Sequence, residues 1–340
     1  MPKAIIVNKA IPAPIFKLSG KQRNFPKKYV KVLKLHHYKV QPEKLSGDAP
    51  KDLIYVYEYG RSRKINSKKW IPYIAKVGHK WFPSESITEH LLTRLGQVWG
   101  FNLAKSRLYV FSGQLRFCSE FFRMPKQELV HGADILARHL LESNAEIIDQ
   151  IDKNGWSQEL LSFKFVKQAI TDVFPEEAND IIFRLINMLL FDAIVGNNDR
   201  HFFNWGVLRD LIGKKKTIFS PIYDTARGLF WNYSDEILLT WEKDSKQLSS
   251  RIIKYNNDSK PKMGWEGKKE INHFQMVKML LINKECTFAL AKQIFSNDNL
   301  KKAEIVLNTE FKGLISDTRK SLIIRSLEYR FEVFNTLLNS

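Results

Sequence analysis

The chain reads Gly196-Asn197-Asn198-Asp199-Arg200-His201-Phe202-Phe203-Asn204-Trp205-Gly206 between two apolar runs. This stretch, the catalytic loop, places Asp199 five positions before Asn204. A further aspartate, Asp224, follows in Ser220-Pro221-Ile222-Tyr223-Asp224-Thr225-Ala226, which we call the metal loop. Asp-x-x-x-x-Asn followed by a later Asp is the layout of the active site of kinases. The pattern predicts an enzyme that transfers a phosphoryl group.

The residue types of the two loops suit this chemistry. Phosphoryl transfer has a loose transition state, so catalysis rests on positioning and on charge stabilisation. Mg²⁺ prefers hard oxygen ligands, usually one or two carboxylates together with phosphates and water. We therefore predict that Asn204 and Asp224 bind Mg²⁺ and that Asp199 accepts or orients the attacking hydroxyl. His201 is grouped with Asp199 as catalytic, and either His201 or Arg200 is expected to brace the loop through backbone carbonyls.

The same polar residues would also suit a turn after a helix, because Asn and Asp satisfy local backbone groups. The flanking sequence favours the catalytic interpretation. Residues 186–195 form an apolar run that leads into the loop, and residues 205–208 and 217–219 read as two strands. A hairpin between the two candidate metal ligands is the arrangement expected of a kinase.

The two loops resemble those of the HipA-like serine/threonine kinases, in particular the compact members of that family. The shared motifs are Gly-Asn-x-Asp-Arg-His-x-x-Asn-Trp-Gly and, further on, Pro-Ile-Tyr-Asp. The resemblance extends from about Leu45 to the last helix. It implies an α+β, two-lobed protein-kinase-like fold with a β-rich small lobe and a mainly helical large lobe. It also implies that the protein uses ATP and Mg²⁺. The Asp-Arg-His-x-x-Asn core is also similar to the phosphoinositide 3-kinase group, so a lipid or small-molecule kinase is the alternative.

A kinase also needs a lysine on a strand of the small lobe and a glutamate on a helix that pairs with it. Residues 70–77 end a β-rich run that contains Lys76, and residues 86–95 read as an amphipathic helix with Glu89 on its first turn. By the resemblance, Lys76 binds the ATP phosphates and pairs with Glu89. Glu85 is the alternative partner.

The segment 45–51 resembles the loop that covers the ATP phosphates in this family. Backbone N–H groups of such a loop can cradle phosphates. Ser46 and Gly47 are therefore candidate ATP contacts, although a plain turn would explain them equally well. Members of the family silence themselves by phosphorylating this loop, which makes Ser46 the candidate autophosphorylation site.

The adenine pocket is expected between the two lobes. Residues 107–111 and 115–122 read as a hairpin, and the end of its second strand, from Glu120 to Phe122, would form the hinge. Hinge contacts are mostly backbone hydrogen bonds, so side-chain types carry little information there. The aromatic residues of this strand would suit a strand core equally well.

The pattern along the chain divides it into three parts. Residues 1–44 are basic and contain several prolines, and they are expected to add a strand layer or to wrap around a lobe. Residues 45–122 are mostly strands and form the predicted small lobe. Residues 123–340 turn helical and form the predicted large lobe with both loops. Within it, residues 225–270 look irregular.

The chain is strongly basic, with 54 Lys and Arg against 36 Asp and Glu and a formal net charge of +18. Such a charge attracts polyanions. Contact with nucleic acid or an acidic partner, and a solvated lysine-rich surface, are equally compatible with it. No helix-turn-helix, zinc finger or RNA-binding motif is evident. A nucleic-acid-binding pseudokinase is the third interpretation.

The resemblance further implies a toxin or effector kinase with a protein substrate, autophosphorylation and an antitoxin partner. Some members of the family act on tRNA-charging enzymes, and a tRNA-associated substrate would suit a basic surface. Cys118 and Cys286 suggest no disulfide framework, and no apolar run is long enough for a transmembrane segment. We expect a cytoplasmic protein, or a secreted effector without a recognisable signal peptide.

Overall fold

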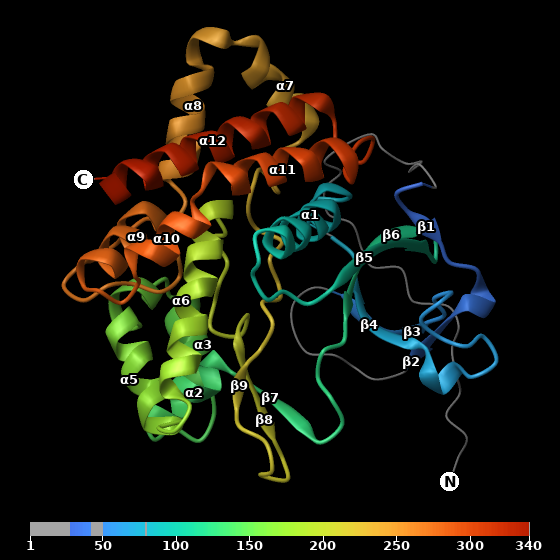
Figure 1. Cartoon of the computed structure of the whole chain (residues 1–340), viewed down its shortest axis with the longest axis horizontal. Coiled ribbons are helices and arrows are strands. Elements are labelled where there is room, and N and C mark those ends of the chain that lie inside the picture. The colour runs from blue at the N-terminus through green and yellow to red at the C-terminus, as the bar shows by residue number, and fades with distance from the viewer. Residues whose placement is uncertain (1–27, 42–49, 79, 340) are drawn as a thin grey trace.

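The computed structural model describes residues 28–41, 50–78 and 80–339, which form a β-rich lobe and a mainly helical lobe (Figure 1). The β-rich lobe is a six-stranded sheet with the order β1-β5-β6-β4-β3-β2. Its strands are β1 (Lys31–Val32), β2 (Tyr38–Gln41), β3 (Lys51–Val56), β4 (Ile71–Lys76), β5 (Ser106–Phe111) and β6 (Gln114–Glu120). All neighbours are antiparallel except β1 and β5. The predicted hairpin is present as β5 and β6, and β1 and β2 extend the sheet into the segment before residue 45.

The sheet carries apolar residues on both faces, because successive side chains of a strand point to opposite sides. On one face, Leu108 of β5 and Phe117 of β6 join the main core. On the other, the neighbouring residues Tyr109 and Cys118 join a second core with residues of β2, β3 and β4. Helix α1 (Ser84–Val98) packs against β5 and β6, and its fully buried Leu92 belongs to the main core.

A three-stranded sheet of β7 (Gln127–His131), β8 (Gly206–Asp210) and β9 (Ile218–Phe219) lies in the helical lobe. Strands β8 and β9 are the hairpin predicted between the candidate metal ligands, with Val207 opposite Phe219. Strand β7 was not predicted, since the sequence reads as helical after Met124. Val130 is its one buried residue, so the strand depends on its pairing with β8 and not on an alternating pattern.

The remaining helices build the large lobe around α6, which is apolar on nearly all sides, as expected of a buried helix. They are α2 (Gly132–His139), α3 (Glu146–Lys153), α4 (Ser157–Leu160), α5 (Phe163–Val173), α6 (Ala178–Val195), α7 (Asp235–Lys243), α8 (Ser245–Asn257), α9 (His273–Ile282), α10 (Phe288–Ile294), α11 (Asn297–Thr309) and α12 (Asp317–Asn339). Within the described residues, no helix combines the length and apolarity needed to cross a bilayer.

The expectation that residues 225–270 are irregular is wrong, because this region contains α7 and α8. Both helices begin at side-chain caps: Ser234 accepts a hydrogen bond from the N–H of Ile237, and Asp244 accepts one from the N–H of Gln247. They bury few apolar residues, among them Leu238, so their amphipathic pattern is faint in the sequence.

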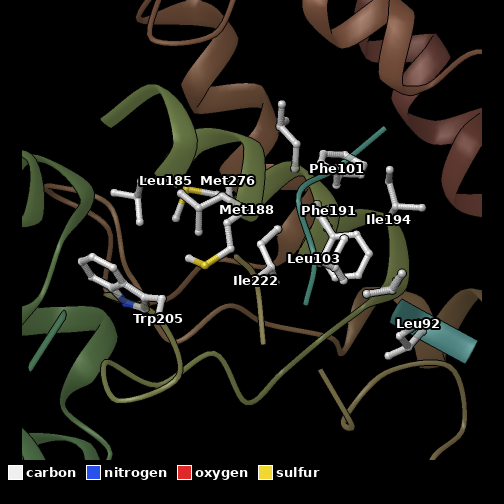
Figure 2. Close-up of a cluster of buried hydrophobic side chains, with 14 of the residues drawn as sticks. Leu92, Phe101, Leu103, Leu185, Met188, Phe191, Ile194, Trp205, Ile222 and Met276 are labelled. Atoms are coloured by element: carbon white, nitrogen blue, oxygen red, sulfur yellow. The ribbon is translucent and has the colours of Figure 1, made fainter. Parts of the chain in front are cut away.

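One buried cluster joins the two lobes (Figure 2). Phe191 of α6 packs edge-on against Phe101, with ring centroids 5.4 Å apart. Around this pair lie residues from α1, the connection to β5, α6, α9 and the two loops, namely Leu92, Leu103, Leu185, Met188, Ile194, Trp205, Ile222 and Met276. Because these residues share one core, the helix that carries Glu89 and the metal loop that carries Asp224 are fixed relative to each other.

Candidate active site

A cleft of about 810 Å³ is lined by residues of both lobes. Its walls come from β4, α1, the end of β6, the catalytic loop and the metal loop. Every predicted site residue within the described ranges lines it, and these are Lys76, Glu89, Glu120, Phe122, Asp199, His201, Asn204 and Asp224. Ser46 and Gly47 lie outside the described residues.

Lys76 is the centre of a three-residue ion-pair group in this cleft. Its Nζ lies 3.0 Å from Oε1 of Glu89 and also contacts Oδ1 of Asp224. Burial alone would lower the pKa of Lys76, but Asp224 and then Glu89 outweigh it and raise the pKa above its usual range. Burial likewise opposes ionisation of Asp224, yet Lys76 lowers the pKa of Asp224. A charged Lys76 and an ionised Asp224 therefore face each other at neutral pH.

The alternative partner, Glu85, has a different role in the structure. Its Oε2 accepts hydrogen bonds from the backbone N–H groups of Lys80, at 3.1 Å, and Trp81, at 3.4 Å. Glu85 thus ties down the turn before α1. Burial raises the pKa of Glu89, against the opposing effect of Lys76, because the carboxylate lies in the interior.

The metal loop is held in an unusual backbone conformation. Asp224 has a φ of +54°, a region that non-glycine residues rarely occupy and that tends to mark functional sites. Two residues earlier, Ile222 is clamped to the connection between α1 and β5. Its N–H donates to the carbonyl of Asn102 at 2.8 Å, and its carbonyl accepts from the N–H of Ala104 at 3.2 Å. These two hydrogen bonds fix the metal loop in the position where the Asp224 carboxylate contacts Lys76.

Arg200 is the brace of the catalytic loop. Its guanidinium forms two bonds with the buried carboxylate of Asp192, with Nε–Oδ2 at 2.8 Å and Nη2–Oδ1 at 2.9 Å. Its Nη1 donates to the carbonyl of Asn204 at 2.8 Å and to the carbonyl of Tyr223. Of the two residues expected to brace the loop, Arg200 therefore does so, and it links the catalytic loop to the metal loop. His201 accepts a local bond from the N–H of Phe203.

Residues from the C-terminal half of the chain contact the start of the catalytic loop. Arg330 of α12 is fully buried, and its Nη1 donates to the carbonyl of Ala193 at 2.6 Å. A Cβ atom on Gly196, whose φ is +65°, would lie 2.5 Å from Nη2 of Arg330. Glycine is therefore required at this turn both by its left-handed backbone and by the packing of Arg330. The next residue, Asn197, accepts a bond from Nε2 of His273 at 2.9 Å.

Asn204 and Asp199 face the cleft with different groups available. Nδ2 of Asn204 donates to the carbonyl of Asp199 at 2.9 Å, which leaves its Oδ1 as an oxygen ligand. The Asp199 carboxylate forms an ion pair with Arg227, with Nε–Oδ2 at 3.1 Å. The sequence analysis did not identify Arg227, because no spacing rule links an arginine after the metal loop to Asp199.

Within the described residues, one backbone N–H group of the predicted hinge, from Glu120 to Phe122, is free to donate to a bound ligand. The N–H of Glu120 donates to the carbonyl of Lys105 at 2.6 Å. Both carboxylate oxygens of Glu120 accept hydrogen bonds from Nη2 of Arg61, each at 3.0 Å. The N–H of Phe121 donates to the carbonyl of Pro72. Phe122 packs against Tyr223, and its N–H has no acceptor among the described residues. Phe122 therefore suits an adenine contact better than Glu120 does.

The donor set fits Mg²⁺. Among the described residues, no cluster of three or more His, Cys, Asp or Glu side chains is arranged to bind a metal by itself. One carboxylate and one amide oxygen, from Asp224 and Asn204, would need phosphate oxygens and water to complete the shell. Mg²⁺ is commonly bound in this way, whereas ions held by the protein alone use more protein ligands.

The two lobes and the cleft between them define a protein-kinase-like fold. The chain belongs to the HipA-like C-terminal domain family, whose model matches residues 44–283. The serine/threonine-protein kinase CtkA of Helicobacter pylori is 30% identical over 146 residues, which are 41% of this chain and 43% of that relative. The chain thus matches less than half of the length of this curated relative.

Solved structures confirm the predicted fold class. The crystal structure of the Helicobacter pylori proinflammatory kinase CtkA superposes with a TM-score of 0.68 at 18% identity, covering 88% of this chain and 95% of that one. HipA of Shewanella oneidensis, solved in a complex with HipB and operator DNA, gives a TM-score of 0.51 at 14% identity, covering 88% and 67%. At these identities the likeness concerns the fold alone.

Proposed function

We propose that this chain is a HipA-like serine/threonine protein kinase that transfers the γ-phosphoryl group of ATP in the presence of Mg²⁺. The observation that carries the proposal is the grouping of Lys76, Glu89 and Asp224 in one cleft with Asp199 and Asn204. These residues come from four separate parts of the sequence. Their convergence supports a kinase site more strongly than either loop motif does.

Each residue has a part in the proposed reaction. Lys76, held by Glu89, would bind the ATP phosphates, as the strand lysine does in kinases. Asn204 and Asp224 would hold Mg²⁺, which neutralises charge on the phosphates when bound. The Asp199 carboxylate would orient the hydroxyl of the protein substrate and take its proton. The N–H of Phe122 would bind the adenine edge.

A lipid kinase is the second candidate, since the same core motif occurs in that group. Membership of the HipA-like family and the likeness to a serine/threonine kinase favour a protein substrate. The complete set of polar site residues argues against a pseudokinase that only binds polyanions through the +18 charge. Parallel assays with a mixed protein substrate and with phosphoinositide vesicles would separate these three functions.

The finer features follow from the family and are proposed with it. We expect autophosphorylation at Ser46, an antitoxin partner, a protein substrate associated with tRNA, and a toxin or effector role in the cytoplasm. Both cysteines are unpaired and buried, as suits a reducing compartment. HipA of Shewanella oneidensis was solved with HipB and DNA, which supports a search for a comparable partner of this chain.

The decisive experiment is incubation with γ-labelled ATP and Mg²⁺, with the wild type beside Asp199→Asn, followed by mass spectrometry. Label on the wild type alone, on serine or threonine, would establish a protein kinase. ATP binding without transfer to itself, to proteins or to lipids would contradict the proposal. A Ser46→Ala variant locates the autophosphorylation site independently of the activity itself.

A further inference from the structure

Arg227 is a cleft residue that the kinase motifs do not account for. It lines the cleft three residues after Asp224, and its Nε lies 3.1 Å from Oδ2 of Asp199. Its guanidinium lies over the ring of Trp231, 4.9 Å from the centroid, and its carbonyl accepts a bond from the N–H of Asn198 at 3.2 Å. These contacts fix a planar cation beside the residue that receives the attacking hydroxyl.

Three other cations near the two loops are already committed to partners. Arg200 is buried and spends its donors on Asp192 and on two backbone carbonyls. Lys76 is shared by Glu89 and Asp224. Lys262 is paired with Asp152, with Nζ–Oδ1 at 2.9 Å.

The side chain of Arg227 ends in a guanidinium cation with five N–H donors. Its terminal nitrogens, Nη1 and Nη2, form no hydrogen bond with any described residue. Arg227 therefore has both charge and donors to give to a bound group.

We propose that Arg227 is a further catalytic residue, which holds Asp199 through Nε and binds the transferred phosphoryl group through its terminal nitrogens. This inference rests on the proposed kinase function. Because Nε occupies Oδ2, the other oxygen of Asp199 is left to receive the substrate hydroxyl. A guanidinium fork matches the geometry of phosphoryl oxygens, which a single ammonium group does not.

The proposed reaction is an ordinary phosphoryl transfer. The substrate hydroxyl oxygen forms a bond to the γ-phosphorus while the bond from that phosphorus to the β,γ-bridging oxygen breaks, and its electron pair leaves with ADP. The hydroxyl proton passes to the free oxygen of Asp199. Arg227 donates hydrogen bonds to the equatorial oxygens, over which the charge is spread in the transition state.

The test compares Arg227→Ala, Arg227→Gln and Arg227→Lys with the wild type in steady-state assays. Removing one preorganised donor to transition-state charge costs roughly 100- to 1,000-fold in kcat. We expect a loss of this size in Arg227→Ala, with the KM for ATP changed less than about threefold, partial recovery in Arg227→Lys, and restoration of Arg227→Ala by added guanidinium. Guanidinium rescue would not be expected for Arg227→Gln, because its side chain fills the space.

The chain offers a matched control in Arg251. This residue also pairs with a carboxylate at 3.1 Å, on Asp244, and lies over a tryptophan ring, on Trp241, but it is remote from the cleft. Arg251→Ala should keep wild-type kcat, and melting temperatures of both variants report on folding. Arg227→Ala with kcat within about threefold of wild type, or a loss that guanidinium does not rescue, would overturn the inference alone. An inactive wild type would overturn the proposed function, and the inference with it.

Discussion

Arg94 of α1 and Glu310, just beyond the end of α11, form a two-bond ion pair, with Nε–Oε2 at 2.7 Å and Nη2–Oε1 at 3.0 Å. Close by, Nε1 of Trp99 donates to the carbonyl of Asn299 at 2.7 Å. Figure 1 shows α1 lying alongside α11. Since α1 carries Glu89, the position of this helix decides whether Glu89 reaches Lys76.

Breaking the Arg94 pair should therefore affect activity more than stability. Both side chains are partly exposed, so the pair contributes at most about 1 kcal/mol to folding. We expect Arg94→Glu to raise the KM for ATP several-fold with a small change in melting temperature. Arg94→Glu combined with Glu310→Arg should restore the KM, and a double variant no better than the single one would refute the coupling.

Variants of Lys76 and Glu89 should show that folding stability and catalytic activity can be changed independently. Lys76→Met leaves the buried Glu89 and the partly exposed Asp224 without their cation. Loss of one partner of a buried ion pair such as Lys76–Glu89 costs about 3–5 kcal/mol. Adding Glu89→Gln should regain part of that stability without regaining activity. Urea denaturation and phosphoryl-transfer assays measure the two quantities. Recovery of activity in the double variant would exclude Lys76 as a phosphate ligand.

Asp199 and Asp224 should differ in nucleotide binding although both are needed for transfer. Asp224→Asn removes the predicted carboxylate ligand of Mg²⁺, so we expect Mg²⁺ to strengthen ATP binding by this variant far less than it does for the wild type. Asp199→Asn should bind Mg²⁺-ATP like the wild type and yet not transfer. Titration calorimetry with and without Mg²⁺ makes the comparison, and equal Mg²⁺ dependence in both variants would argue against the assignment.

His273 makes the stability of the fold depend on pH. Burial lowers the pKa of His273 to about 3, and its Nε2–H donates to the carbonyl of Asn197. The unfolded chain binds this proton at a pKa near 6.5, so stability is full above pH 6.5 and falls as the pH is lowered toward 3. At pH 5 the loss amounts to about 2 kcal/mol. Unfolding curves at pH 7 and pH 5 should show a smaller difference for His273→Gln, and an unchanged difference would contradict this account.

The parts of the site that could be predicted are those encoded by local spacing. Asp199, Asn204 and Asp224 lie within one short stretch, and the hairpin between them follows from two apolar strands. Helix α5 lies in the region that was predicted to be helical, and its apolar residues recur at the helical period. The pairing of Lys76 with Glu89 required the family resemblance as well as the pattern.

The parts that could not be predicted depend on contacts between distant residues. Strand β7 exists through its ladder with β8, more than seventy positions away in the chain. No local sequence pattern encodes the hydrogen bond from Arg61 to Glu120. The same holds for the ion pair between Arg227 and Asp199. Residues 45–49 stay a prediction, since the predicted phosphate loop falls largely outside the described residues.

The contacts of Arg330 and Glu310 bear on how much of the chain is needed to hold the candidate site together. The family match stops at residue 283, yet α11 and α12 lie beyond it, and they seat both α1 and the turn at Gly196. A fragment cut at residue 283 would keep every proposed catalytic side chain and lose the contacts that hold α1 and the turn at Gly196. We therefore expect the smallest folding unit of this chain to extend beyond the residues that the family model matches.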